Sequence, residues 1–389
     1  MLPDPRDPVA LTQALVRCPS VTPEEGGALS LIEDILKDAG FATTRKLFSD
    51  TGTPDVDNLY ARIGTGSPCL MFAGHTDVVP TGDAGAWTSP PFAGEIIKGT
   101  LYGRGTTDMK GGVAASIAAS LRFLDTRQGQ FNGSIAFLLT GDEEGPAVNG
   151  TVKLLDWAKA QGETWDHCIL GEPTNPERLG DMIKIGRRGS LTGVVSVQGK
   201  QGHVAYPDLA INPISGLMRL MAALKDTPLD AGTAHFAPSN LEFTSVDVGN
   251  PASNVIPNTA QAVFNVRFND VWTSTSLAEA LSARLQTAAG NEIRYQVEFK
   301  PTNAEAFLTA PGPFVEMVAD VVATQTGLTP KLSTTGGTSD ARFIKNYCPV
   351  LEFGLVGQTM HQIDERVETK DLVELADIYQ AILDRTFQS

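Results

Sequence analysis

Four short, mostly apolar segments constrain the fold of this chain more than any other feature. They are Cys69–Ala73, Ile135–Leu139, Cys168–Leu170 and Val350–Phe353. Segments of this length and composition are typical of strands that are buried on both faces of a sheet. Helical patterns lie between several of them, so we expect an α/β fold whose mostly parallel central sheet is flanked by helices.

Residues that can bind metal ions follow each of these four segments. His75 follows the first, Glu143 and Glu144 follow the second, Glu172 follows the third, and His361 comes eight residues after the fourth. In open α/β sheets, ligand sites lie beyond the carboxyl ends of the strands. We therefore expect these four chain segments to converge at one edge of the sheet.

A glycine-rich stretch, Leu101–Gly112, presents one more acid, Asp108, among four glycines. Glycines allow a backbone to approach a site closely and to adopt angles that other residues resist. An aspartate held in this way has both carboxylate oxygens available to cations. Taken alone, the stretch fits equally well with a loop that places an aspartate at the start of a helix.

Two imidazoles and three carboxylates together make a set that suits zinc. The set is His75, Asp108, Glu144, Glu172 and His361. Five ligands are enough for two ions if one carboxylate bridges them. Each residue has a structural explanation by itself, such as a core histidine or a polar turn residue. All five at one sheet edge favour a metal site, because clustered charges without partners are costly.

Two further acids have roles that their positions suggest. Asp77 lies two residues after His75, so on an extended chain both side chains project to the same side. We expect Asp77 to hold the second nitrogen of that imidazole. Glu143 is the neighbour of Glu144 and is expected to act as a general base toward water. The structural alternative for Glu143 is an ordinary acidic loop.

Residues 189–302 follow a different pattern, with alternating strands and two amphipathic helices in the order β-α-β-β-α-β. This order is that of a ferredoxin-like sandwich. A chain of 389 residues is also long enough for two domains. We expect a catalytic domain formed by residues 1–188 and 303–389, interrupted by a lid and dimerisation domain at 189–302.

Charge and cysteine usage exclude several classes of partner. A net charge of −15 argues against binding to nucleic acid or to an anionic membrane. The residues after Met1 lack the basic and apolar regions of a signal peptide. Cys18, Cys69, Cys168 and Cys348 form no C-x-x-C pair and suggest reduced thiols. We therefore expect a cytoplasmic protein.

Several motifs resemble those of the co-catalytic zinc amidohydrolases, a family that includes acetylornithine deacetylase, aminoacylase and several carboxypeptidases. The similar stretches are Gly74–Pro80, Gly103–Gly111, Asp142–Gly145, Gly171–Pro173, Gly186–Gly193, Gly202–Pro207 and Gly336–Asp340. The resemblance covers nearly the whole chain. It implies a zinc-exopeptidase-like catalytic domain and a cis peptide bond after Asp108.

The resemblance also implies a role for each site residue. His75 and Glu172 would bind one zinc ion, Glu144 and His361 the other, with Asp108 as the bridge and Glu143 as the base. Cobalt could substitute for zinc at either position. The implied substrate-binding residues are Arg187, Ser190, Tyr206, Asn254, Arg267, Gly337 and Thr338. Asp77 and His203 complete the catalytic set, with His203 donating a hydrogen bond to the oxyanion in the partner's site of a homodimer.

The implied reaction is hydrolysis of N-succinyl-LL-2,6-diaminopimelate to succinate and LL-2,6-diaminopimelate. Arg187 and Arg267 suit this small N-acyl amino diacid, since guanidinium groups grip carboxylates in pairs of hydrogen bonds. Composition alone would make them surface arginines, and His203 a surface turn residue. Gly357 departs from the family, which usually has asparagine four residues before the last histidine ligand.

Other activities remain as alternatives. One is deacylation of a different N-acyl amino acid, as in acetylornithine deacetylase, whose substrate would need Arg187 less. Another is a non-catalytic binding protein on the same scaffold, which the complete ligand set and Glu143 disfavour. Serine hydrolase chemistry is disfavoured because the sequence has no G-x-S-x-G motif.

Overall fold

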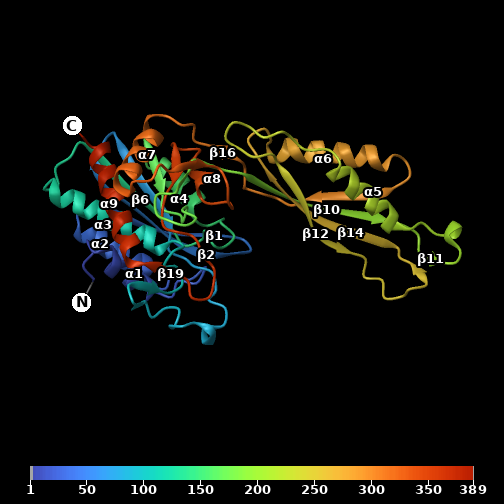
Figure 1. Cartoon of the computed structure of the whole chain (residues 1–389), viewed down its shortest axis with the longest axis horizontal. Helices are drawn as coiled ribbons and strands as arrows, with labels where there is room; N and C mark the ends of the chain where they lie inside the picture. Colours follow the sequence, from blue (N-terminus) through green and yellow to red (C-terminus); the bar gives the residue numbers. More distant parts are fainter. Residues whose placement is uncertain (1–2, 389) are drawn as a thin grey trace. The chain divides into compact units, whose positions relative to one another are not determined.

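The computed structural model describes residues 3–388, which form two compact units (Figure 1). The first unit runs up to Ile185 and also includes Thr309–Ser333 and the chain from Ser339 onward. The second unit comprises Gly186–Leu308 and Thr334–Thr338. It therefore takes in short segments on both sides of the predicted range 189–302, and a third segment from later in the chain.

A mixed sheet forms the centre of the first unit. Within the described residues its eight strands lie in the order β1 (Ala42–Asp50), β2 (Thr53–Thr65), β6 (Gly133–Thr140), β3 (Cys69–His75), β7 (His167–Leu170), β18 (Val350–Glu352), β8 (Met182–Lys184), β17 (Lys331–Ser333). Strands β6, β3, β7 and β18 are mutually parallel. The hairpin of β1 and β2 extends this sheet antiparallel to β6. The predicted parallel centre, built from the four apolar segments, is thus confirmed.

The first unit also contains helices. They are α1 (Pro8–Val16), α2 (Ala28–Asp38), the short η1 (Ala84–Ala86), α3 (Lys110–Thr126), α4 (Thr151–Ala160), α7 (Pro313–Thr326), α8 (Ala341–Ile344) and α9 (Thr369–Thr386). A small sheet of β4 (Glu95–Ile97), β5 (Thr100–Tyr102) and β19 (Arg366–Glu368) accompanies them. No helix among residues 3–388 has both the length and the apolar character required to span a bilayer.

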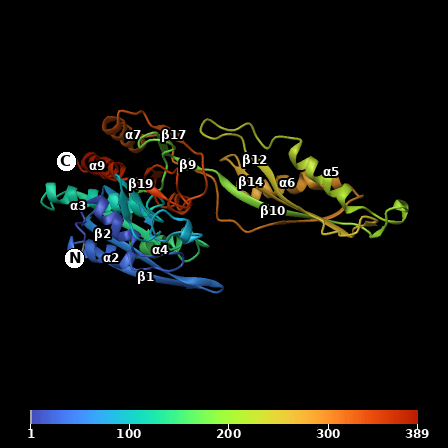
Figure 2. The ribbon, with the colours of Figure 1, turned by 60° about the horizontal axis from the view of Figure 1, so that its bottom comes forward.

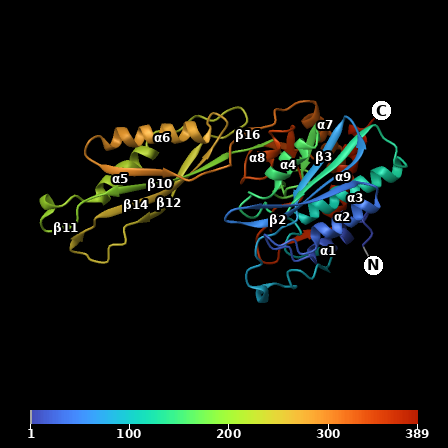
Figure 3. The same ribbon diagram turned by 180° about the vertical axis from the view of Figure 1, so that it is seen from behind.

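Both faces of this sheet are covered, as the aromatic contacts demonstrate. Phe72 of β3 packs on Tyr379 of α9, with ring centroids 5.3 Å apart. On the opposite face, Tyr60 of β2 meets Trp157 of α4 at 6.0 Å. Figures 2 and 3 show α3 and α9 on one side of the strands and α4 on the other. A strand buried on both faces has no solvated side, which explains its continuous apolar sequence.

The second unit has the predicted order of elements. They are β10 (Gly189–Gln198), α5 (Pro213–Lys225), β12 (Asn240–Asp247), β14 (Thr259–Phe268), α6 (Ser274–Ala289) and β15 (Arg294–Phe299). The strands form an antiparallel sheet in the order β12-β14-β10-β15. Leu217 of α5 and Leu281 of α6 pack with Phe264 in one apolar core. Alternate positions of β10, such as Thr192, are only partly buried, as a sheet with helices on one face requires.

Short elements complete the second unit. Strand β9 (Gly186–Arg187) pairs with β16 (Phe307–Leu308), and β11 (Gly202–His203) pairs with β13 (Val255–Ile256). The single turn η2 (Pro207–Leu209) follows β11. The pair β9–β16 lies at the two points where the chain enters and leaves this unit. The pair β11–β13 lies at the tip of the unit, beyond the end of β10 (Figure 1).

Candidate metal centre

The predicted ligands lie at the carboxyl ends of the parallel strands. His75 is the last residue of β3, while Glu144 and Glu172 follow β6 and β7. The register pairs Ala73 with Leu138 of β6 and with Leu170 of β7, so these three strands end at nearly the same level. The loops that follow the strands therefore emerge side by side.

Asp108 faces both histidines with different oxygens. Its Oδ1 lies 3.2 Å from Nε2 of His75, and its Oδ2 lies 3.2 Å from Nε2 of His361. Glu172 adds Oε1 at 3.9 Å from the first imidazole, and Glu144 adds Oε1 at 2.8 Å from the second. The five residues thus form two groups of nitrogen and oxygen donors that share one aspartate. This is the arrangement that a bridging carboxylate between two ions requires.

Local backbone geometry brings Asp108 to this position. The peptide bond between Asp108 and Met109 is cis, as the resemblance implied. Helix α3 begins directly afterwards, and a Cβ atom on Gly112 would lie only 2.3 Å from the carbonyl oxygen of Gly171. Only glycine allows α3 to start this close to the segment that carries Glu172.

Asp77 contacts His75 through its backbone rather than its side chain. Nδ1 of His75 lies 2.8 Å from the carbonyl oxygen of Asp77, whereas the nearest carboxylate oxygen is 3.6 Å away. Since a carbonyl can only accept, Nδ1 carries a proton, and Nε2 is the ring nitrogen that faces the carboxylates of the site. The Asp77 carboxylate instead accepts the backbone amides of Glu143 at 3.3 Å and Glu144 at 3.1 Å.

The electrostatics of the cluster indicate a deficit of positive charge. Burial, the largest effect, and repulsion from nearby acids such as Asp340 raise the pKa of Glu143 to about 8. Burial, followed by the charges of Asp108 and Glu143, also raises the pKa of Glu172 well above its usual value. Hydrogen bonds with Asp108 and Glu144 raise the pKa of His361 to about 10. Carboxylates crowded in this way are stabilised by bound cations.

The donor set also has capacity for such cations. Among the described residues, Oε1 of Glu172 is buried and has no hydrogen-bond partner. Two sets of three donors have ligand atoms within 4.8 Å of one another: His75, Asp108 and Glu144, and His75, Glu143 and Glu172. An unsatisfied buried carboxylate oxygen is unusual and calls for a partner. Both sets contain His75, and the second contains Glu143 in place of Asp108, so they outline one cluster of the nitrogen and oxygen donors that zinc prefers.

The predicted substrate residues of the second unit fall into two groups. In the first, Arg187 donates to the carbonyl oxygen of Gly337 at 3.1 Å, and Ser190 pairs with Arg267 across β10 and β14. Thr338 follows Gly337 in the segment Thr334–Thr338 of the same unit. No acidic partner of Arg267 occurs among the ion pairs of the described residues. Arg267 is therefore a cationic group that no acid among the described residues neutralises.

The second group lies around the pair β11–β13. His203 and Tyr206 have ring centroids 5.7 Å apart, and the carbonyl oxygen of Asn254 accepts the amide of Val204 at 3.0 Å. Ser190 lies at the start of β10, whereas this group lies beyond its end at Gln198. Eight residues of extended strand span roughly 26 Å. The structure therefore does not bring the two groups of one chain together around one small molecule.

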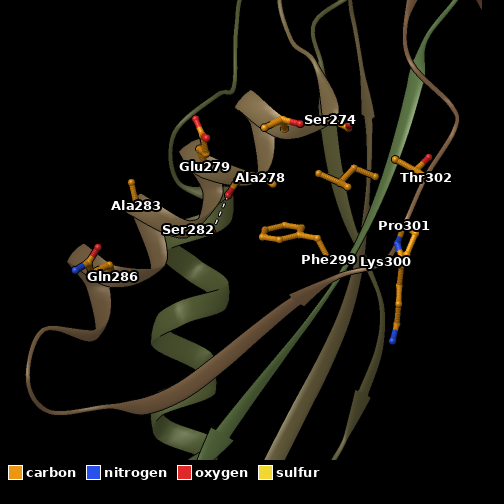
Figure 4. Close-up of a pocket in the computed structure, with 12 residues that line it drawn as sticks. Ser274, Ala278, Glu279, Ser282, Ala283, Gln286, Phe299, Lys300, Pro301 and Thr302 are labelled. Atoms are coloured by element: carbon orange, nitrogen blue, oxygen red, sulfur yellow. Dashed lines mark hydrogen bonds between the residues drawn. The ribbon is translucent and has the colours of Figure 1, made fainter.

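A groove of about 580 Å³ also lies in the second unit, between α6 and the end of β15 (Figure 4). Its walls include Ala278, Ser282, Phe299 and Thr302. The Ser282 hydroxyl donates to the carbonyl oxygen of Ala278 at 2.7 Å, so this hydroxyl already has a hydrogen-bond acceptor in its own helix. None of the predicted site residues lines this groove.

Two residues that the sequence analysis did not single out contact the Asp108 loop. Glu365 accepts the backbone amides of Thr107 and Asp108, and Arg104 pairs with Glu365. A signal for Arg104 was present, because it stands between the glycines of the stretch Gly103–Gly111. Nothing in the local sequence singles out Glu365, which lies 257 positions from Asp108.

Comparisons with known proteins show the family of this chain. The model of peptidase family M20/M25/M40 matches residues 71–385. A succinyl-diaminopimelate desuccinylase of Methylorubrum populi is 65% identical over 99% of this chain and 99% of its own length. A tripeptidase structure from Staphylococcus aureus has a TM-score of 0.78 at 17% identity, with both chains fully covered. A dinuclear metal-binding peptidase structure from Bacillus subtilis has a TM-score of 0.69 at 15% identity, covering 97% and 98% of the two chains. The chain therefore belongs to peptidase family M20/M25/M40.

Proposed function

We propose that this protein is a metal-dependent amide hydrolase that converts N-succinyl-LL-2,6-diaminopimelate and water to succinate and LL-2,6-diaminopimelate. The observation that carries the chemistry is Asp108, whose two oxygens each face a different imidazole at 3.2 Å. The choice of substrate is supported by the 65% identity to a desuccinylase over nearly the full chain.

Two zinc ions are the proposed cofactors. His75 and Glu172 would hold one ion, Glu144 and His361 the other, and Asp108 both. When bound, the ions would polarise the scissile carbonyl and lower the pKa of a water molecule. The backbone contact of Asp77 places a proton on Nδ1 of His75 and turns Nε2 toward the proposed ion, and the Asp77 carboxylate fixes the loop that carries Glu143 and Glu144.

Glu143 is the proposed general base and acid. Its carboxylate accepts a proton from the attacking water and returns it to the amine nitrogen as the C–N bond breaks. Bound cations would offset the surrounding acids that raise the pKa of Glu143 in their absence, so the carboxylate is ionised at the start of the reaction. The bond chemistry then yields one new carboxylate, that of succinate, and one free amine.

Recognition of the substrate is proposed to involve Arg187, Ser190, Arg267, Gly337 and Thr338. Their guanidinium, hydroxyl and backbone donors suit the carboxylates of a succinyl amino diacid. The position of Gly357 has room for a side chain, since a Cβ there would come no closer than 3.4 Å to Pro173. A larger side chain would therefore fit at position 357, and crowding does not require glycine there.

A homodimer is proposed because one chain separates its two groups of substrate residues by roughly 26 Å. In a dimer, His203, Tyr206 and Asn254 of one chain would serve the site of the other. His203 would then donate a hydrogen bond to the oxyanion of the tetrahedral intermediate. The four free cysteines support the cytoplasmic location predicted from the sequence.

The deciding experiment compares hydrolysis of N-succinyl-LL-2,6-diaminopimelate with hydrolysis of N-acetylornithine by purified protein whose metal content is measured. We expect turnover of the succinyl substrate at two zinc ions per chain and reversible loss of activity with a chelator. Preferential turnover of N-acetylornithine would replace the proposed substrate. Full activity without metal would refute the mechanism.

A further inference from the structure

A fully buried ion pair joins the loops that carry two of the proposed metal ligands. Nη1 of Arg104 lies 2.7 Å from Oε2 of Glu365, and these residues are 2% and 0% exposed. A buried ion pair is weak evidence for stability, because loss of hydration offsets most of the attraction between its charges. The presence of the Arg104–Glu365 pair is therefore better explained by the backbone groups that it contacts.

Glu365 contacts the backbone of the Asp108 loop. Its Oε1 accepts the amide of Thr107 at 2.9 Å and the amide of Asp108 at 3.2 Å. The carboxylate thus uses one oxygen for the ion pair and the other for two amides that precede the cis peptide bond. This arrangement fixes the direction in which the Asp108 side chain leaves the backbone.

Arg104 contacts the backbone of the His361 loop. Nη1 donates to the carbonyl oxygen of Gln362 at 3.1 Å, and Nη2 lies 3.5 Å from that of His361. Nη2 also donates to the carbonyl oxygen of Pro80 at 3.3 Å, in the segment after Asp77. A planar guanidinium can serve several acceptors at once in a fixed geometry, which an ammonium group cannot.

The His361 loop has a backbone that needs such support. His361 has φ of +62° and Asp364 has φ of +60°, both in the left-handed region that residues with a side chain rarely adopt. Conformations of this kind persist where the surroundings enforce them. The guanidinium holds the carbonyls of His361 and Gln362, directly within this loop.

We infer that Arg104 and Glu365 are positioning residues that set the distance between Asp108 and His361 and thereby preform one cation site. The inference rests on the proposed dinuclear site. It adds that this site is organised by the protein before a cation binds, through a pair that touches neither substrate nor metal. The other site, with His75 and Glu172, should depend on the pair less, through Asp108 and the segment of Pro80.

The test measures zinc and cobalt binding by calorimetry in Arg104→Lys, Glu365→Gln and the unaltered protein, each first freed of metal. Arg104→Lys keeps the positive charge but loses the planar guanidinium that donates to several acceptors at once. Glu365→Gln keeps an oxygen for the amides but places an amide group against Arg104. We expect binding of one of the two cations to weaken by about 10- to 100-fold, the range for residues that orient metal ligands. The absorption spectrum of the cobalt-loaded protein should change with it.

The matched control is Arg122→Lys. Arg122 pairs with Asp377 at 2.9 Å in the same unit, but these side chains are 26% and 52% exposed. This control should bind both cations as the unaltered protein does. Circular dichroism spectra of each metal-free variant, recorded at low temperature, establish whether the variant is folded.

Each outcome has a distinct meaning. If the unaltered protein binds no pair of cations, the proposed function fails. If it binds two and both folded variants bind them with unchanged affinity and cobalt spectrum, the positioning role is overturned while the proposed function stands. Variants that fail to fold with or without cations would make the pair a determinant of folding alone, which also overturns the inference.

Discussion

His75 and Asp77 are linked through the backbone carbonyl of Asp77, which accepts from Nδ1 of His75 at 2.8 Å. The buried Asp77 side chain therefore remains available for other partners, and it accepts the amides of Glu143 and Glu144. One aspartate thus orients a proposed metal ligand with its main chain and the proposed base with its side chain. These two roles can be separated by mutation.

Replacement of Asp77 by asparagine should lower kcat more than it lowers metal binding. The backbone carbonyl still selects the tautomer of His75, but the carboxamide cannot accept both amides of the Glu143 loop equally well. We expect kcat to fall about 10- to 100-fold, with two zinc ions retained per chain. Steady-state kinetics and metal analysis on the same preparation measure both quantities. Loss of one zinc ion in step with activity would contradict this division of roles.

Glu143→Gln should abolish proton transfer while leaving the ligands intact. General acid–base catalysis typically contributes about 10²- to 10⁴-fold, so kcat should fall by that factor at unchanged metal content. Glu144→Gln is the matched control, because it changes the adjacent residue and should weaken cation binding. If Glu143→Gln lost metal and Glu144→Gln kept it, the two assignments would have to be exchanged.

The sequence predicted those parts of the fold that depend on the apolar pattern of individual strands and helices. The four apolar segments gave the parallel centre, and the position of His75 at the end of β3 follows from the same pattern. The β-α-β-β-α-β order in the second unit could likewise be read from alternation and helix periodicity. Each of these features depends on a local property, namely which faces of a single helix or strand are buried.

Other features depend on contacts between distant segments and could not be predicted. A period of two indicates that His75 and Asp77 project to the same side, but not that the imidazole contacts a carbonyl. Glu365 approaches Asp108 only because β19 pairs with β5, which brings two distant segments side by side. The separation of Ser190 from His203 follows from the length of β10. The resemblance assigned His203 to the partner's site but grouped Tyr206 and Asn254 with Ser190.

His167 should make the stability of the first unit depend on pH. Its ring is half-buried, stacks on Phe314 at 4.1 Å, and burial lowers its pKa below the usual 6.5. The unfolded chain therefore binds a proton more readily than the folded chain. This contribution is complete above pH 6.5 and is lost as the pH falls through the lower folded pKa.

The test is His167→Phe, which keeps an aromatic ring against Phe314 but cannot titrate. The difference in Tm between this variant and the unaltered protein should change in favour of the variant between pH 7.5 and pH 5. Both proteins are measured with chelator, so that metal binding does not contribute. A constant difference in Tm across this range would contradict the prediction.

In the proposed dimer, two variants that are each inactive should complement each other when they are mixed. His203 lies beyond the far end of β10 from Ser190, so a site served by both residues would need two chains. Glu143→Ala and His203→Ala should each have very low activity alone. In a mixed dimer, the His203→Ala chain keeps its own Glu143 and receives an intact His203 from the other chain.

Mixing the two variants under conditions of subunit exchange should therefore restore about a quarter of the unaltered activity per chain, since half of the dimers are mixed and each has one complete site. Native mass spectrometry establishes that mixed dimers have formed. A mixture of Glu143→Ala with Glu143→Gln is the control and should remain inactive, because no chain in it has the base. Mixed dimers of Glu143→Ala and His203→Ala that show no recovery would place His203 in the site of its own chain or outside catalysis.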